Sequence, residues 1–235
     1  MNEKEYNDQL DELFKEWKEK RRGYEKLTED GILIFKKWEE QPLKILFLLK
    51  EAYQKDTCFR KNPLQKDGAF NNNIGLWRYL LLKIWKEPTK PISFSDANKV
   101  LSQDPHNLIG DIAIVEVKKN NEGKGTSKPK DILKYAKDDK GYLQKQIDLI
   151  NPHIVVCCGT GDSYFEIYGW NNKVNPLNTV NKKYSCYSHS NRLMIDFYHP
   201  SHKRYSGGFP ALFELLGVLL KNGNVFQEFD WSKKA

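Results

Sequence analysis

Near the C-terminal end of the chain, a histidine and a serine lie next to several cations. A stretch with an apolar strand pattern, residues 193–195, runs toward His199-Pro200-Ser201. Because Pro200 has a fixed φ and disfavours helix at the residue before it, the strand should end there and present the imidazole from a stiff turn. Basic groups suited to phosphate follow at once: His202, Lys203 and Arg204. The segment could therefore serve a phosphate-bearing ligand, although an ordinary strand-ending turn with a solvated histidine has the same pattern.

Two carboxylates accompany strand-like runs elsewhere in the chain. Residues 44–49 (KILFLL) form a continuous apolar run that is typical of a strand buried on both faces, and Glu51 follows it. Ligands of open α/β sheets bind at that end of the strands, so Glu51 is a candidate site residue, with a solvated loop acid as the alternative. Glu116 interrupts a second run, residues 112–117 (IAIVEV), so it lies either at an exposed strand end or toward a site.

An aromatic residue and a glycine-containing turn complete the candidates. Phe70 follows Gly68 in a polar stretch and could offer a flat face to a ligand or pack in the core. A third buried strand, residues 153–158 (HIVVCC), leads into Gly159-Thr160-Gly161 and a helix. Such a turn could cradle a phosphate, but it lacks the full dinucleotide fingerprint, so a tight turn is the simpler interpretation.

The elements that must position these residues alternate between strands and helices. Apolar spacing and capping residues predict helices over the first ~20 residues, 28–38, 73–84, 95–101, 141–150 and 209–221. The predicted fold class is α/β, as a three-layer α/β/α domain with a short, mainly parallel sheet of four strands. Residues 1–42 are expected to form an N-terminal helical extension, and residues 43–235 the α/β domain.

Composition favours a globular protein with an acidic partner. Of the 235 residues, 39% are hydrophobic and 13% aromatic, and the formal net charge is +7. Lysines cluster near loops, which suits nucleic acid, whereas lysines scattered over a basic soluble protein are the alternative. The longest apolar runs are too short to span a bilayer and the N-terminus is not a signal peptide, so we expect a cytoplasmic monomer without a membrane segment. The four cysteines lack C-x-x-C spacing, which indicates reduced thiols rather than disulfides or a metal site.

The candidate motifs occur in one order along the chain. A strand with Glu51-Ala52-Tyr53 is followed by Gly68-Ala69-Phe70, then by the strand IAIVEVKK, by QIDLINPHIVVCCG and finally by YHPS. From Lys44 to about Leu220 this series resembles the uracil-DNA glycosylase superfamily. The resemblance implies a uracil-DNA glycosylase-like α/β fold, DNA as the partner and base flipping before reaction.

The resemblance also assigns roles to residues. It implies that Glu51 places or activates water, with Ala52 and Tyr53 in the same substrate-binding motif, and that Phe70 stacks on a flipped base. His199 matches the family's catalytic histidine and Ser201 its phosphate-contacting serine, while the three basic residues that follow would bind DNA.

This sequence departs from the family's pattern at two places. Lys50 and Tyr53 replace the glycine and proline of the first motif, and no asparagine is present on the strand that should read the base. The position that corresponds to this asparagine is Val115 or Glu116. An ionised glutamate only accepts hydrogen bonds, so a base that presents an amino group is expected if Glu116 points into the pocket.

The expected function is that of a DNA glycosylase that hydrolyses the N-glycosidic bond of a modified or damaged base, without metal or cofactor. The altered first motif and the missing asparagine leave a second hypothesis, a catalytically inactive nucleic-acid-binding protein of the same fold. A third hypothesis is a nucleotide-binding enzyme of the doubly wound type that uses the turn at residues 159–161.

Overall fold

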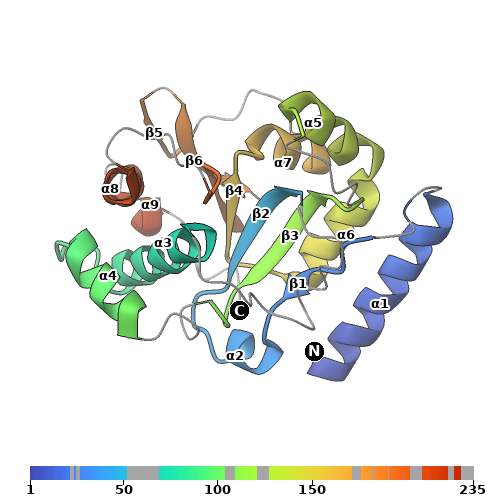
Figure 1. The fold of residues 1–235 in the computed structure, drawn as a ribbon, viewed down its shortest axis with the longest axis horizontal. Coiled ribbons are helices and arrows are strands. Elements are labelled where there is room, and N and C mark those ends of the chain that lie inside the picture. The colour runs from blue at the N-terminus through green and yellow to red at the C-terminus, as the bar shows by residue number, and fades with distance from the viewer. Residues whose placement is uncertain are drawn as a thin grey trace.

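Four parallel strands form the centre of the sheet in the computed structural model of the chain (Figure 1). They correspond to the four predicted strands, and their order across the sheet is β3 (Ala113–Lys118), β2 (Ile45–Glu51), β4 (Ile154–Cys158) and β7 (Arg192–Phe197). The α/β class with mainly parallel central strands is therefore confirmed.

The number of strands differs from the prediction. The structure describes residues 1–21, 24, 27–51, 69–103, 109–120, 127–170, 176–181, 183–189, 191–201, 208–221 and 225–228. Within these ranges the sheet has seven strands rather than four, because antiparallel strands extend both edges. They are β1 (Gly31–Ile32), which pairs with β3, β6 (Tyr184–His189), which pairs with β7, and β5 (Asn178–Val180), which pairs with β6. Two of these strands have only two and three residues, too few for a periodic pattern.

The central strands are apolar throughout because helices cover both faces of the sheet. On β2, Ile45, Phe47 and Leu49 face one core, whereas Leu46 and Leu48 face the other. The first core is covered by α3 (Ala69–Lys86), α4 (Phe94–Gln103), α8 (Gly208–Lys221) and α9 (Val225–Glu228). The second is covered by α1 (Glu3–Lys20), α2 (Phe35–Glu39), α5 (Pro129–Asp138), α6 (Lys140–Ile150) and α7 (Gly161–Tyr168). Figure 1 shows α3, α4, α8 and α9 on one side of the sheet and α1, α5, α6 and α7 on the other.

Local sequence explains where several helices begin and end. Asn2 and Glu5 form a capping box at the start of α1, whose buried residues recur at helical spacing as predicted. Helix α6 ends at Asn151, which has a left-handed φ of 48°, directly before Pro152. Helix α7 ends in the same way at Gly169, with φ 66°. The predicted helices near residues 1–20, 141–150 and 209–221 are confirmed.

Three helix predictions need correction. The segment expected to be helical from Thr28 contains β1 instead, and α2 begins only at Phe35. Helix α3 begins at Ala69, so Asn73 lies inside the helix and does not cap it. Helix α5 was not predicted, because only Ile132 and Ala136 form its buried stripe. The boundary at residue 42 stays a prediction.

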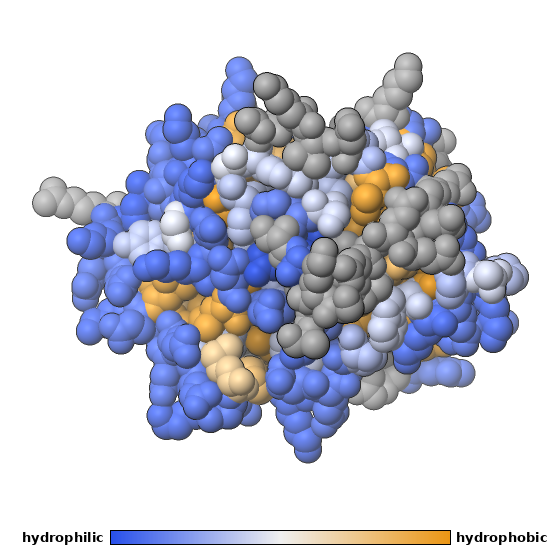
Figure 2. Space-filling model, turned by 180° about the vertical axis from the view of Figure 1, so that it is seen from behind, coloured by the Kyte–Doolittle hydropathy of each residue, from blue (hydrophilic) through white to orange (hydrophobic). Residues whose placement is uncertain are grey.

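Polar residues cover most of the surface seen from behind in Figure 2, and apolar residues form small patches there. Among the described residues, the large apolar side chains that are exposed are Met1, Leu133 and Val218. No helix in the described ranges combines the length and the apolar character needed to cross a membrane. Three of the four cysteines are described, and Cys157, Cys158 and Cys186 are buried and free.

Candidate functional site

The carboxyl ends of β2, β3, β4 and β7 meet at one edge of the sheet, which is where open α/β sheets bind ligands. The structure describes five of the residues predicted for the site, and four of them lie in or directly after these strands: Glu51, Glu116, His199 and Ser201. The fifth, Phe70, lies in the first turn of α3. Five other predicted site residues lie outside the described residues and stay predictions: Ala52, Tyr53, His202, Lys203 and Arg204.

Three donors hold the carboxylate of Glu51, the last residue of β2. The Ser127 backbone N–H donates to Oε1 and the Ser127 hydroxyl donates to Oε2, each over 2.5 Å. The Lys118 ammonium lies 3.1 Å from Oε2 and also donates to the Ser127 hydroxyl oxygen over 3.1 Å. Glu51 is only 7% exposed, so the alternative of a solvated loop acid is wrong. The carboxylate is fixed in one orientation, as a group that must act on one substrate atom needs to be.

Parallel strand pairing explains why Lys118 is available to Glu51. The two residues are direct partners in the register of β2 and β3, so their side chains leave the sheet on the same face. The Lys118 ammonium also lies 5.4 Å from the ring centroid of Tyr135 on α5. Sequence reasoning missed both Lys118 and Ser127. The alternation of the 112–117 run would have placed Lys118 on the face of Glu116, whereas nothing in the sequence around Ser127 indicated its role.

The strand registers place His199 on the same side of the sheet as Glu51. Leu48 pairs with Cys157, and Cys158 pairs with Phe197. Glu51 is the last residue of β2, and His199 comes two residues after the end of β7. Two residues earlier in each strand, Leu49 and Phe197 both belong to the core under α3.

Contacts around His199 confirm that it faces α3. The centroid of its imidazole lies 6.1 Å from the ring centroid of Phe70, with the planes tilted by 40°. The Ser201 backbone N–H donates to Nδ1 of His199 over 3.3 Å, and the Ser201 hydroxyl lies 2.8 Å from the same nitrogen. Because Nδ1 accepts the backbone N–H, a neutral imidazole carries its proton on Nε2. Ser201, predicted to contact phosphate, orients His199 in this structure.

Asn73 supports the same turn from α3 and was missed as a site residue. Its Nδ2 donates to the backbone carbonyl of Pro200 over 2.5 Å, which fixes the turn next to His199. Its Oδ1 is buried and has no hydrogen-bond partner among the described residues. The sequence indicated a capping residue at this position, and only the fold brings it to a residue 127 positions away.

Glu116 is buried in β3 on the face that carries Lys118. It is 2% exposed, and its Oε2 has no hydrogen-bond partner within the described part of the chain. Burial raises the pKa of this carboxyl well above its ordinary value, and the nearby carboxylates of Asp30 and Glu51 raise it further, whereas Lys119 opposes them. The shift favours the protonated form of Glu116, which can both donate and accept hydrogen bonds.

The turn at residues 159–161 is built for close packing. Gly159 has a left-handed φ of 68°, and the Thr160 hydroxyl donates to the Leu48 carbonyl over 2.7 Å. The Gly161 N–H donates to the carboxylate of Asp196, which approaches so closely that a side chain at position 161 would overlap it. A carboxylate of the protein thus occupies the place where a phosphate would bind, which argues against the nucleotide-binding hypothesis.

The described site offers a fixed carboxylate, an oriented imidazole, an aromatic face and a buried carboxyl group whose pKa is raised. Among the described residues, no group of three or more histidine, cysteine, aspartate or glutamate side chains is placed to hold a metal ion. The carboxylate and the imidazole are suited to stabilising opposite charges on the two sides of a breaking bond. No protein-family model matches the chain, and no curated protein matches it significantly.

Proposed function

We propose that this chain is a DNA glycosylase of the uracil-DNA glycosylase-like fold that hydrolyses the N-glycosidic bond of a flipped modified or damaged base. The observation that carries the proposal is that Glu51 and His199 lie at the carboxyl edge of the same sheet, with Glu51 fixed by Ser127 and Lys118 and Phe70 against the imidazole of His199. A fixed carboxylate and an oriented imidazole at one edge suit a sugar and its base. The sequence resemblance supports the same reaction independently.

Each residue has a role in the proposed reaction. Breaking the bond between C1′ and the base nitrogen develops positive charge on the sugar and leaves the electron pair on the base. The Glu51 carboxylate would stabilise the sugar cation and orient the water that attacks C1′. The Nε2–H of His199 would donate to the departing base. Phe70 would stack on the flipped base, which offsets ~1 to 3 kcal/mol of the energy needed to leave the duplex.

A second candidate function is nucleic-acid binding without cleavage. It is favoured by the same bonds that fix Glu51, because Ser127 and Lys118 already engage both oxygens of the carboxylate that would have to orient water. In that case the carboxylate would serve to hold the loop before α5 in place. The two candidates share the fold and the DNA partner and differ only in turnover.

Base release separates the two candidates. End-labelled oligonucleotides that carry uracil, hydroxymethyluracil, hypoxanthine, xanthine or modified cytosines are incubated with the protein, and alkali then reveals abasic sites. Glu51→Gln and His199→Ala are the test variants. Glu39→Gln is the matched control, because Glu39 also pairs with a lysine, Lys44, but lies before β2 at the opposite edge.

Cleavage at one base that is lost in both test variants and kept in the control supports the glycosylase. Binding to every oligonucleotide without any abasic site refutes it and supports the binding protein. Cleavage that survives Glu51→Gln and His199→Ala would show that the reacting groups lie elsewhere in the chain.

A further inference from the structure

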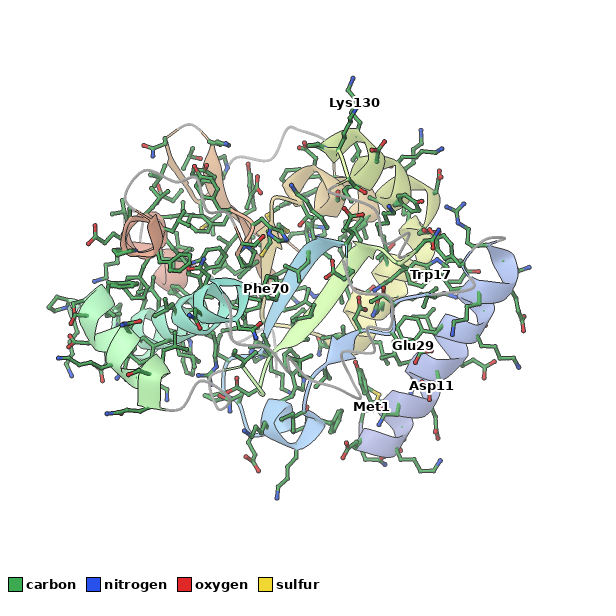
Figure 3. All side chains as sticks on the ribbon, in the orientation of Figure 1. Met1, Asp11, Trp17, Glu29, Phe70 and Lys130 are labelled. Carbon is green, nitrogen blue, oxygen red and sulfur yellow. The ribbon has the colours of Figure 1, made fainter. Side chains whose placement is uncertain are left out.

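Helix α5 presents a stripe of lysines to solvent. Lys130, Lys134 and Lys137 are exposed and recur at intervals of four and three residues, which places them on one face of the helix. Figure 3 shows Lys130 at the end of α5, with its side chain pointing away from the body of the molecule. The opposite face of α5, with Ile132 and Ala136, packs into the core.

The acidic residues of α5 do not neutralise this stripe. The Asp131 carboxylate accepts a hydrogen bond from the backbone N–H of Lys128 over 3.2 Å and so caps the start of the helix. The Asp138 carboxylate lies 3.5 Å from the guanidinium of Arg21. Within the described residues, no ion pair includes a lysine of the stripe.

The stripe begins at the end of the helix where a lysine is least favourable. A helix carries a partial positive charge at its N-terminus, so cations are normally found in the last turn and anions in the first. Lys130 lies in the first turn of α5, and the exposed Lys128 precedes it. Residues that oppose the stability of a helix occur preferentially at functional positions. Here the positive end of the helix and the lysines would attract the same anion.

The same end of α5 is tied to the candidate site. Ser127, two residues before Pro129 begins α5, donates two hydrogen bonds to Glu51. Tyr135, on the second turn, lies against the Lys118 ammonium that pairs with Glu51. Figure 1 shows α5 next to the ends of β2 and β3. The first turn of α5, which carries Lys130, therefore starts close to the Glu51 carboxylate, and a polyanion bound at that end lies near the carboxyl edge of the sheet.

We propose that Lys130, Lys134 and Lys137 bind successive backbone phosphates of the DNA whose flipped nucleotide enters the site at Glu51 and His199. The seven steps from Lys130 to Lys137 rise about 10 Å along the helix, and one DNA strand advances about 3.4 Å per phosphate, so the stripe covers about three phosphates. This inference rests on the proposed function for its ligand, but it concerns backbone binding rather than catalysis.

Salt dependence of binding tests the stripe. Fluorescence anisotropy measures the affinity of the full chain for a short undamaged duplex between 50 and 200 mM NaCl. The test variant is K130Q/K134Q/K137Q. The control K4Q/K36Q/K99Q removes the same charge from exposed lysines of α1, α2 and α4, and K130R/K134R/K137R keeps the charge of the stripe. Circular dichroism and thermal melting check that each variant is folded.

Loss of three phosphate contacts should reduce the slope of the logarithm of the binding constant against the logarithm of the salt concentration by about 2.7. Between 50 and 200 mM NaCl, the fall in affinity of the glutamine variant should therefore be about 40-fold smaller than that of the wild type. The α1/α2/α4 control and the arginine variant should keep the wild-type slope. Equal slopes for the two glutamine variants overturn the proposal, and so does a wild-type chain that does not bind the duplex. Failure of the glycosylase is recognised separately, as bound DNA from which no base is released.

Discussion

Replacing Asp196 by asparagine should make the protein more stable at neutral and alkaline pH. Asp196 lies near the end of β7, three residues before His199, and its carboxylate accepts the N–H of Gly161 at the start of α7. The pKa of this carboxyl is raised from 3.8 to about 7, mainly by burial and in addition by the neighbouring Asp162, whereas the Gly161 bond and Lys183 oppose the shift. An asparagine oxygen can still accept the Gly161 N–H, but it carries no charge to desolvate.

The pKa shift gives both the sign and the size of the effect. Because the folded state holds the proton of Asp196 more tightly than the unfolded chain, the contribution of Asp196 to stability is highest below about pH 4 and falls as the pH rises toward about 7. A shift of about three pH units corresponds to about 4 kcal/mol. Asp196 keeps some contact with solvent, so this figure is an upper bound. For a chain of this length, 2 to 4 kcal/mol raises the melting temperature by roughly 4 to 8 °C.

Thermal or urea unfolding of the wild type and Asp196→Asn at half-unit steps from pH 4 to pH 8 measures this difference. The two curves should meet near pH 4 and separate toward pH 8, with the variant more stable. Asp162→Asn is the control, because it removes the neighbouring charge from an exposed position and should reproduce only a small part of the gain. A variant whose stability has the same pH dependence as the wild type would show that Asp196 titrates normally and would refute the argument.

Three further substitutions have defined outcomes. Ser127→Ala removes the hydroxyl that donates to Glu51, so base release should slow about 10- to 100-fold while DNA affinity is kept. Ser127→Thr keeps a hydroxyl and should restore most of the rate. Single-turnover kinetics measure the rate and fluorescence anisotropy the affinity, and a fall in affinity instead of rate would contradict this expectation. Lys119→Met removes the ion-pair partner of the buried Asp30 carboxylate and should lower the free energy of urea unfolding by about 3 to 5 kcal/mol. A loss below about 1 kcal/mol would contradict this expectation. Gly161→Ala places a methyl group against Asp196 and should lower the melting temperature by several degrees, whereas an unchanged melting temperature would show that the turn can relax.

Local apolar pattern was sufficient to predict the centre of the fold but not the short edge strands β1 and β5. The runs at 44–49, 112–117 and 153–158 are continuous because both faces of a parallel sheet are buried, and that signal does not depend on the partner strand. Strand β1 has two residues and is a strand only because it pairs with β3, more than 80 residues later. Helix α5 was missed for a related reason, since its exposed lysines resemble the loop that precedes it.

Some residues of the candidate site could likewise be predicted from local pattern and others could not. The positions of Glu51 and His199 could be predicted because each follows a strand end, and strand ends can be read locally. Their partners could not be predicted: Ser127 reaches Glu51 across 76 residues and Asn73 reaches Pro200 across 127. The packing of α5 against β3 brings the first pair together and the position of α3 the second, and neither leaves a periodic signal in the sequence.

The chemistry of Glu116 shows how burial can reverse a deduction made from residue type. The sequence argument disfavoured a uracil-like base because an ionised glutamate only accepts hydrogen bonds, whereas the absent asparagine both donates and accepts. In the structure, desolvation and two nearby carboxylates raise the pKa of Glu116 well above its ordinary value, and its Oε2 has no partner among the described residues. The shift favours the protonated form, which offers one donor and one acceptor, as an amide does. Bases with a carbonyl or an amino group at that edge therefore both belong among the substrates to be tested.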